Sequence, residues 1–387
     1  MAFIPYSRQN VSDEDIEAVC RVLRSDFLTQ GPVIPAFEER FAARHAVAHA
    51  VAVNSATAGL HIGCMALGVG PGSLVWTSPI SFVASANCAL YCGAEVDFVD
   101  IDPLTRNMSV VLLRAKLEQA AATGRLPDVL IPVDFGGLPC DLREMRELAD
   151  HYGFKILEDA SHGAGGTYLG QPVGSRFAHA TVFSFHAVKV ITTAEGGLVT
   201  TQDAQLAHRL RSLRSHGLTR EPAEMTHPYP GPWYYEQHAL GYNYRLTDVQ
   251  AALGLSQLQR LDEFHARREA LVEQYEKLLA DAPLLLPPRF ADRRCAWHLY
   301  AVEIDESRTS RARTDVFMAL RQAGIGVNVH YIPIHTQPYY EQLGFKRGDF
   351  PASERYYDRA LSIPLFPALT SEQQAFVAHT LREALRS

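Results

Sequence analysis

The strongest constraint on the fold is an alternation of short apolar runs with helical patterns through the first half of the chain. Strand-like runs occur at residues 96–99, 129–133, 155–157, 181–183 and 198–200. Helical patterns separate them, and a clear one covers residues 142–152. Strands that alternate with helices form βαβ units around a mainly parallel sheet. The sequence therefore predicts an α/β protein, and in such open sheets ligands bind outside the carboxyl ends of the strands.

The alternation stops in the second half of the chain. Residues 212–244 are rich in Pro, Tyr, His and Gly, which indicates either a long functional loop or a disordered excursion. A helical pattern then runs from Asp248 to about Leu279. Two further strand candidates follow, at residues 299–304 and 326–331. We therefore expect a large domain over residues 1–250 and a smaller C-terminal α+β domain over residues 251–387, joined by the long helix.

Lys189 is the first candidate for a catalytic residue. It follows the apolar run 181–185 and precedes the paired glycines Gly196 and Gly197. An ordinary lysine amine has a pKa of about 10.4 and is protonated at neutral pH, so it forms an imine only where its surroundings lower that pKa. The apolar run indicates a buried strand that would supply such surroundings. Taken alone, a lysine after a strand is more often a solvated loop residue.

Asp159 is the second candidate, at the end of the apolar run 154–160. A parallel strand would deliver its carboxylate to the same sheet edge as Lys189, where it could pair with the ring nitrogen of a pyridine cofactor such as pyridoxal phosphate. A carboxylate there keeps the nitrogen protonated, so that the ring withdraws electrons from the substrate. The alternative is an aspartate that caps the next helix or pairs with an arginine.

A third segment, residues 51–61, changes from an apolar strand to small hydroxyl and amide residues and then to a helical pattern. The N-terminus of such a helix offers free backbone N–H groups and a positive dipole end, both of which favour a phosphate. An ordinary capped helix is the alternative. The chain contains neither a P-loop motif nor a dinucleotide fingerprint, which argues against those two nucleotide-binding classes.

Six segments in a fixed order carry a resemblance to a known family. They are residues 54–61, 77–87, 158–162, 184–189, 195–197 and 241–248. Together they resemble the DegT/DnrJ/StrS family of pyridoxal-phosphate aminotransferases, which act on nucleotide-linked keto-sugars and share the aspartate-aminotransferase fold, called fold type I. The resemblance extends from residue 4 to residue 366. Residues 27–32, 240–247 and 329–333 look most like the family's transaminases of pseudaminic acid biosynthesis.

The resemblance implies roles for individual residues. It places Lys189 on the cofactor aldehyde, Asp159 on the pyridine nitrogen and Phe82 on the ring face. His162 stands where many members have a glutamine near the phenolic oxygen, and an imidazole can donate a hydrogen bond there. The remaining implied contacts are Thr57, the backbone of Ala58 and Ser184 for the phosphate; Asn243 of the second subunit for the same phosphate; and Tyr6, Thr29, Arg245, His330 and Tyr331 for the substrate. A homodimer with shared active sites follows from this pattern.

Composition excludes several other classes. The net charge of −7 argues against a general nucleic-acid binder. His45 and His49 lack further ligands at zinc-site spacing, so we expect no metal site. The longest mildly apolar stretch, residues 47–70, is interrupted by polar residues and does not indicate a membrane span. The six cysteines form no C-x-x-C pair and are expected to be free buried thiols. No signal peptide is recognised, and we expect a cytoplasmic protein.

The function implied by the resemblance is a transamination in two halves. Glutamate, as amino donor, would leave its amino group on the cofactor, and a nucleotide-linked 4-keto-6-deoxy sugar, UDP-linked by the narrower resemblance, would then receive it. Two alternatives stay open: sugar dehydration on the same fold, and amination of a different keto-sugar nucleotide. Family dehydratases replace the lysine with histidine, whereas Lys189 is present here.

Overall fold

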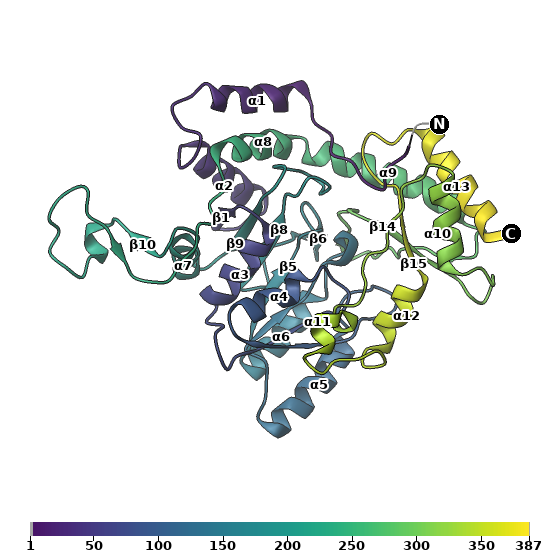
Figure 1. The fold of residues 1–387 in the computed structure, drawn as a ribbon, viewed down its shortest axis with the longest axis horizontal. Helices are drawn as coiled ribbons and strands as arrows, with labels where there is room; N and C mark the ends of the chain where they lie inside the picture. The colour runs from purple at the N-terminus through teal and green to yellow at the C-terminus, as the bar shows by residue number, and fades with distance from the viewer. Residues whose placement is uncertain (1–2, 387) are drawn as a thin grey trace.

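A computed structural model describes residues 3–386 and has a mainly parallel sheet at its centre (Figure 1). Within these residues the sheet has seven strands in the order β1-β9-β8-β5-β4-β2-β3. The strands are β1 (His49–Val53), β2 (Leu74–Thr77), β3 (Glu95–Phe98), β4 (Val129–Ile131), β5 (Lys155–Asp159), β8 (Ala180–Ser184) and β9 (Gly197–Thr201). Strand β9 pairs antiparallel with both β8 and β1, whereas the other neighbouring pairs are parallel. The predicted α/β class and mainly parallel sheet are confirmed.

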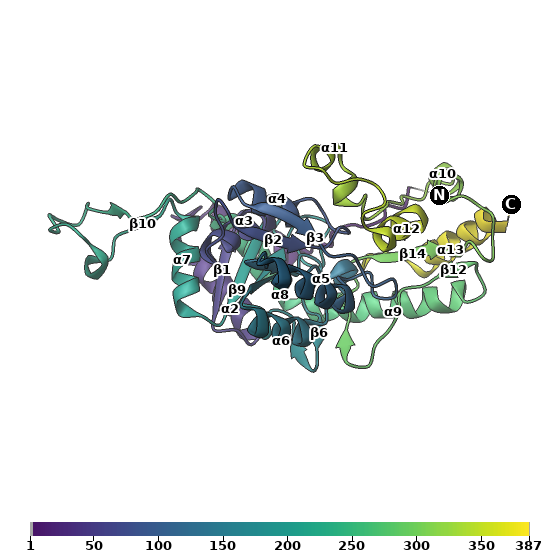
Figure 2. The same ribbon diagram turned by 90° about the horizontal axis from the view of Figure 1, so that it is seen from below.

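Helices cover both faces of this sheet, as the view in Figure 2 shows. They are α2 (Val33–Arg44), α3 (Ala56–Ala66), α4 (Ala84–Tyr91), α5 (Val110–Thr123), α6 (Leu142–Tyr152), α7 (Ala204–Arg214) and α8 (Asp248–Gln259), and α1 (Asp13–Leu23) packs on the outer side of α8. Alternate residues of a strand point to opposite faces, so Leu157 joins the core under α3 and α4 while its neighbour Ile156 joins the core under α5 and α6. Strands buried on both faces are near-continuous apolar runs, which is why the sequence revealed them.

A smaller layer of helices packs on a three-stranded antiparallel sheet near the C-terminus. Its elements are α9 (Leu261–Leu279), β12 (Leu284–Leu285), β14 (Tyr300–Ile304), α10 (Arg313–Gln322), α11 (Pro338–Glu341), α12 (Pro351–Arg359), β15 (Ala360–Ile363) and α13 (Ser371–Arg386). Its core includes Ile4 from the N-terminal segment and Leu138 from the loop after β4. The N-terminal segment therefore packs with the C-terminal elements, and the domain division at residue 250 stays a prediction.

Two expectations about the C-terminal half are corrected. The strand expected at residues 326–331 is not formed; Ile325 makes a single bridge to Ile4 and Asn328 one to Ser362, because the chain then turns toward the cavity described below. Strand β15 occupies the place beside β14 instead. The long helix expected from Asp248 to Leu279 has the correct ends but breaks at Arg260, whose backbone (φ −98°, ψ 5°) leaves the α-helical region.

Residues 215–243 form a projecting arm, visible beyond α7 at the left of Figure 1. Its base is a two-stranded ribbon, β10 (Leu218–Thr219) with β11 (Glu236–Gln237), and its outer part holds the short helix η2 (Pro222–Glu224). The carboxylate of Glu236 organises the arm, because it accepts hydrogen bonds from Thr226, His227, Tyr234 and His238. The sequence left a functional loop and a disordered excursion open, and the structure shows an ordered ribbon.

The remaining elements are short and lie in the connections between these layers. They are η1 (Phe135–Gly137), β6 (Thr167–Tyr168), β7 (Gln171–Pro172), β13 (Arg293–Arg294) and η3 (Ile334–Thr336). Strands β13, β6 and β7 form a small antiparallel sheet that joins the loop before β14 to the loop after β5. Among residues 3–386, no helix combines the length and the apolar character that a membrane span requires.

Candidate active site

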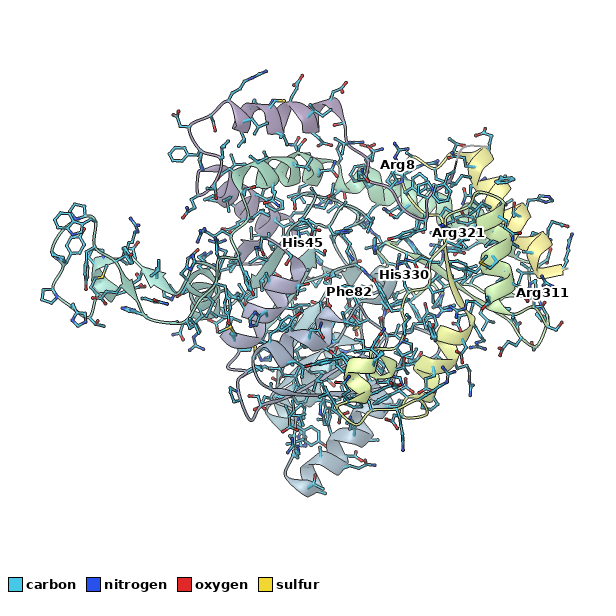
Figure 3. All side chains as sticks on the ribbon, viewed as in Figure 1. Arg8, His45, Phe82, Arg311, Arg321 and His330 are labelled. Atoms are coloured by element: carbon cyan, nitrogen blue, oxygen red, sulfur yellow. The ribbon has the colours of Figure 1, made fainter. Side chains whose placement is uncertain are left out.

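A cavity of about 590 Å³ opens at the carboxyl ends of β5 and β8, between them and residues 328–331 of the C-terminal half. It is the place where the largest share of the predicted site residues meet. Those that line it are Tyr6, Thr57, Phe82, Asp159, His162, Ser184, Lys189, His330 and Tyr331. Figure 3 shows Phe82 and His330 near the middle of the molecule. The expectation that functional groups gather at this sheet edge therefore agrees with the position of the cavity.

Lys189 lies in the loop that follows β8. Its N–H donates to the carbonyl of His186 (2.9 Å), and the carbonyl of Val188 accepts from Ser7 Oγ (3.1 Å). The next two residues, Val190 and Ile191, are buried and fix the far side of the loop. Burial lowers the pKa of the Lys189 amine to about 8, and the nearby Asp159 carboxylate opposes that effect. An appreciable fraction of the amine is thus neutral and nucleophilic near neutral pH.

Asp159 ends β5 and lies on the cavity wall, 4% exposed. One carboxylate oxygen accepts from Ser85 Oγ of α4 (2.6 Å), and the other accepts from both the N–H (3.1 Å) and the Oγ (2.6 Å) of Ser161. Ser81 Oγ in turn lies 2.6 Å from Ser85 Oγ. These donors stabilise the ionised carboxylate and fix its direction, so a negative charge stands ready at a defined position.

Directly behind Asp159 lies a pair of fully buried carboxyl groups, those of Asp134 and Glu158. Asp134 accepts from the N–H of Cys140 and Glu158 from Thr181 Oγ1, while the remaining oxygen of each acid has no hydrogen-bond partner among the described residues. Burial raises the pKa of Asp134 to about 7, and burial together with the Asp134 charge raises the pKa of Glu158 well above its usual value. At least one of the two acids is therefore protonated at neutral pH, because two adjacent buried carboxylates cannot both ionise cheaply.

The N-terminus of α3 forms the other end of the cavity. Ser55 caps the helix and accepts from the N–H of Ala58 (3.1 Å), so that N–H already has a partner, and the buried Ala58 does not line the cavity. Among residues 3–386, no acceptor takes the N–H groups of Ala56 and Thr57. A Cβ on Gly197 would lie 2.6 Å from the nitrogen of Ala56. The absence of a side chain at Gly197 therefore leaves this turn room to present its N–H groups to an anion.

A group of aromatic side chains closes the remaining wall. His162 Nδ1 accepts from the N–H of Gly136 (3.2 Å), so a neutral ring carries its proton on Nε2, which lies 3.2 Å from the Tyr331 hydroxyl. Burial, together with the positive charge of Lys189, lowers the pKa of His162 well below its usual value. His330 is held by Ser362 and Asn328, and burial lowers its pKa to about 3. Both rings are therefore neutral hydrogen-bonding groups at neutral pH.

Besides Ala58, three predicted residues lie outside the cavity wall of this chain. Thr29 is exposed and forms a bridge to Thr247. Asn243 is exposed; its carbonyl accepts from Asn54 Nδ2 (3.4 Å), and its backbone pairs with Ser215. Arg245 is half-buried on the same segment. The assignments of all three, and of Ala58, stay predictions.

Sequence reasoning missed several residues that line or support the cavity. Ser85 and Ser161 hold Asp159, and Ser161 could have been found because it is two residues after that aspartate. The His298 ring lies against that of His162, tilted by 45° with ring centres 4.4 Å apart. His186 and Glu195 stand at the rim, with His186 Nε2 3.9 Å from Glu195 Oε1. His298 comes from a loop more than a hundred residues away from His162, so only the fold brings the two rings together.

Comparison with known proteins agrees with this geometry. Residues 9–382 match the model of the DegT/DnrJ/EryC1/StrS aminotransferase family. The chain belongs to this family. It is 41% identical to the spore coat polysaccharide biosynthesis protein SpsC of Bacillus subtilis over 99% of its own length and 97% of that protein. This member of the DegT family is therefore a sugar aminotransferase, as the sequence predicted.

Solved structures give the same fold. Helicobacter pylori PseC, an aminotransferase involved in the biosynthesis of pseudaminic acid, superposes with a TM-score of 0.91 at 30% identity and covers 99% of each chain. The sugar aminotransferase Spr1654 of Streptococcus pneumoniae, in its PMP form, superposes with a TM-score of 0.90 at 29% identity over 99% of each chain. The predicted PLP-dependent, fold type I architecture is confirmed, and the cofactor of this DegT family member is pyridoxal 5′-phosphate.

The residues present fit that cofactor. Its aldehyde requires a lysine amine that can lose its proton, its pyridine nitrogen requires a fixed carboxylate, and its phosphate requires free N–H groups. Lys189, Asp159 and the turn at Ala56 and Thr57 supply these three features along one cavity. The close approach of Gly197 to Ala56 shows that the turn leaves no room for a side chain on its inner side.

Proposed function

We propose that the enzyme transfers the amino group of glutamate to the keto carbon of a nucleotide-linked 4-keto-6-deoxy sugar, UDP-linked, in the cytoplasm, in the pseudaminic acid pathway or a related amino-sugar pathway. The observation that carries the proposal is the meeting of Lys189 and Asp159 in one cavity with an open helix N-terminus. The similarity to PseC supports the sugar class, and the higher identity to SpsC supports a related pathway as well.

Four groups of this chain would hold the cofactor. Asp159 would keep the pyridine nitrogen protonated, and its three hydrogen bonds keep that carboxylate from rotating away. Phe82, whose ring is 59% exposed, would cover one face of the ring. His162 would donate from Nε2 to the phenolic oxygen in place of its present contact with Tyr331. The N–H groups of Ala56 and Thr57, with the hydroxyls of Thr57 and Ser184, would bind the phosphate.

Pyridoxal phosphate, when bound, supplies an aldehyde that accepts the amino group and a ring that withdraws electrons from the substrate. Lys189 carries out the proton transfers. Once the incoming amine displaces it, its Nζ removes the proton from the α-carbon of glutamate and later returns a proton to the sugar carbon. A pKa near 8 suits both directions, because a general base works best near the operating pH.

A second copy of the chain would complete the site. The charged side chains on the described cavity wall are those of Lys189, Asp159 and Glu195, with no arginine among residues 3–386 of the wall. A phosphate, a diphosphate and the carboxylates of glutamate require more positive charge than this wall holds. In a closed two-fold dimer, Arg245 of the partner subunit would supply positive charge, and Asn243 of the partner subunit, which is exposed on its own chain, would supply a neutral hydrogen-bond donor.

The test is an assay of the holoenzyme with glutamate and a panel of keto-sugar nucleotides that differ in nucleotide and in the position of the ketone. We expect an amino sugar and 2-oxoglutarate in equal amounts with a UDP-linked 4-keto-6-deoxy sugar. The Lys189→Ala variant should be inactive, and a matched variant at the exposed Lys155 should keep wild-type turnover.

Other outcomes decide between the alternatives. A product that has lost a hydroxyl and gained no nitrogen would establish sugar dehydration. Amination of a ketone at a different ring position, or of a sugar on another nucleotide alone, would keep the aminotransferase and replace the proposed substrate. Turnover of no sugar nucleotide at all, with glutamate consumed, would overturn the assignment of the second substrate.

A further inference from the structure

His298 lies on the wall of the active-site cavity, on the loop before β14, and is 3% exposed. Its N–H donates to the carbonyl of Gly136 (2.9 Å), and the N–H of Gly136 donates to His162 Nδ1 (3.2 Å). The His298 and His162 ring centres are 4.4 Å apart. The backbone of Gly136 therefore holds both imidazoles next to each other at the cavity wall.

The hydrogen bonds of the ring nitrogens distinguish His298 from the other buried histidines of this wall. Both ring nitrogens of His162 and both of His330 have partners. Within residues 3–386, neither ring nitrogen of His298 has one, and Nδ1 is fully buried, so Nε2 is the nitrogen that reaches the cavity. A buried donor without an acceptor is rarer in proteins than a buried acceptor without a donor. The neutral ring therefore carries its proton on Nε2 and directs a hydrogen-bond donor into the cavity.

A buried positive charge lies behind this donor. Arg268 of α9 is 1% exposed. Its Nη1 donates to three backbone carbonyls, those of Trp297 (3.0 Å), His298 (3.5 Å) and Leu365 (3.1 Å). Burial lowers the pKa of the Arg268 guanidinium only to about 10, so it is charged at neutral pH, and no carboxylate among the described residues pairs with it. A buried cation without a counter-ion is costly, so an anion bound in front of His298 would be stabilised.

We propose that His298 Nε2, with the charge of Arg268 behind it, binds the α-carboxylate of the amino donor, a role that rests on the proposed transfer from glutamate. This carboxylate is bonded to the carbon whose proton Lys189 removes, so its binding site must lie beside Lys189 in the same cavity. Burial lowers the pKa of His298 well below its usual value, and the charges of Lys189 and Arg268 lower it further, so the ring stays neutral. Its N–H and the carboxylate would form a charge-assisted hydrogen bond.

The other anions of the reaction fit this position less well. The free N–H groups of Ala56 and Thr57, at the N-terminus of α3, suit the cofactor phosphate at another end of the cavity. The diphosphate of a sugar nucleotide is separated from the keto carbon by the sugar ring, so it lies away from Lys189. The carboxylate of the amino donor is the anion whose chemistry places it next to the reacting atoms. His298 should therefore act on the first substrate and not on the second.

The experiment measures the half-reaction with glutamate alone. The holoenzyme is mixed with glutamate and the change in cofactor absorbance is followed, which gives an apparent Kd and a limiting rate. His298→Phe keeps a ring against His162 and removes the donor, whereas His298→Gln keeps a donor near the position of Nε2. We expect the apparent Kd for glutamate to rise about ten- to a hundredfold in His298→Phe and to return toward the wild-type value in His298→Gln. Titration with 2-methylglutamate, which has no α-proton, should show the same rise without proton transfer.

Two controls separate donor binding from a general effect on the cavity. The pyridoxamine form of each variant is mixed with the keto-sugar nucleotide that the substrate panel identifies, and the apparent Kd for that sugar should change far less than the Kd for glutamate. The matched variant is His151→Phe, which replaces an exposed histidine of α6 and should bind glutamate like the wild type. Should His298→Phe fail to fold, His298→Leu removes the same donor with a smaller side chain.

Three results would overturn the proposal. They are an unchanged Kd for glutamate in the donor-free variant, an equal loss for glutamate and the keto-sugar, and a His298→Gln variant as impaired as His298→Phe. Failure of the proposed function would look different. If the wild type reacts with another α-amino acid in place of glutamate, the donor is wrong, and the same comparison with that amino acid tests His298 because the α-carboxylate is common to both. If no keto-sugar nucleotide reacts, the titrations with the amino donor still decide the role of His298.

Discussion

The lowered pKa of Lys189 leads to a quantitative prediction about how the enzyme captures its cofactor. With a pKa of about 8, about one Lys189 amine in ten is neutral at pH 7. An unperturbed amine of pKa 10.5 would be neutral in about one molecule in three thousand at that pH. The structure therefore predicts roughly three hundred times more reactive amine at pH 7 than a solvated lysine would offer.

The assay mixes the cofactor-free enzyme with pyridoxal phosphate and follows the absorbance of the new covalent bond over a range of pH. The second-order rate constant should rise about tenfold per pH unit and level off near pH 8. Asp159→Asn removes the negative charge that opposes the effect of burial, so the inflection should move to lower pH. The same variant should turn over orders of magnitude more slowly, because the ring nitrogen loses its carboxylate.

This combination of faster capture and slower turnover separates electrostatics from folding. A misfolded Asp159→Asn variant would lose both cofactor capture and turnover. If Asp159 acts through its charge, the variant captures the cofactor faster at low pH and turns over more slowly. An inflection near pH 10 in the wild type would show that Lys189 is solvated, and a shift to higher pH in the variant would show that Asp159 does not act on the amine. Either result would refute the reasoning.

Four further predictions test other parts of the site and its support. Borohydride reduction of the holoenzyme should fix the cofactor covalently on Lys189, as peptide mapping would show. Mixed dimers of Lys189→Ala with Asn243→Ala should regain activity toward half that of the wild type, because one of the two sites carries neither substitution. No gain over the two parent variants would mean that Asn243 acts in its own subunit. Gly197→Ala should weaken phosphate binding, which equilibrium dialysis would measure. The matched control is Gly70→Ala, where the added Cβ meets open space. Because the pKa of Asp134 is raised to about 7 in the folded protein, its contribution to the free energy of unfolding is fully present below about pH 4 and is lost as the pH rises through 7. Asp134→Asn should remove this loss of up to about 4 kcal/mol, and denaturant melts at pH 4 and pH 7 would measure it.

The sequence predicted those features that depend on neighbouring residues. Apolar runs buried on both faces marked the strands, and a polar residue directly after such a run marked the sheet edge where Asp159 and Lys189 meet. The break at Arg260 escaped prediction because the residues on both sides continue a helical pattern, and only the backbone geometry shows the interruption. The segment 326–331 is apolar enough for a strand, but its backbone partners lie far away in the chain.

The support around the cofactor site was also out of reach of the sequence. Ser85 and Asp159 are separated by 74 positions, and nothing local in α4 indicates that one serine hydroxyl will point at a carboxylate on another element. The contact between the His298 and His162 rings likewise depends on how the two halves of the chain pack. Local patterns thus indicate which groups carry the chemistry, and the tertiary structure decides which groups hold them in place.

The reversed strand β9 has a consequence for the order in which the site can be built during synthesis. Strand β1 lies at an edge of the described sheet and pairs with β9, whose residues are made long after it. The phosphate-binding turn follows β1 and is pressed against Gly197, the first residue of β9. A nascent chain that ends before β9 has no partner for β1 and no wall behind that turn. Such a chain cannot retain the cofactor, so pyridoxal phosphate can be captured only after the ribosome has passed the last residue of β9.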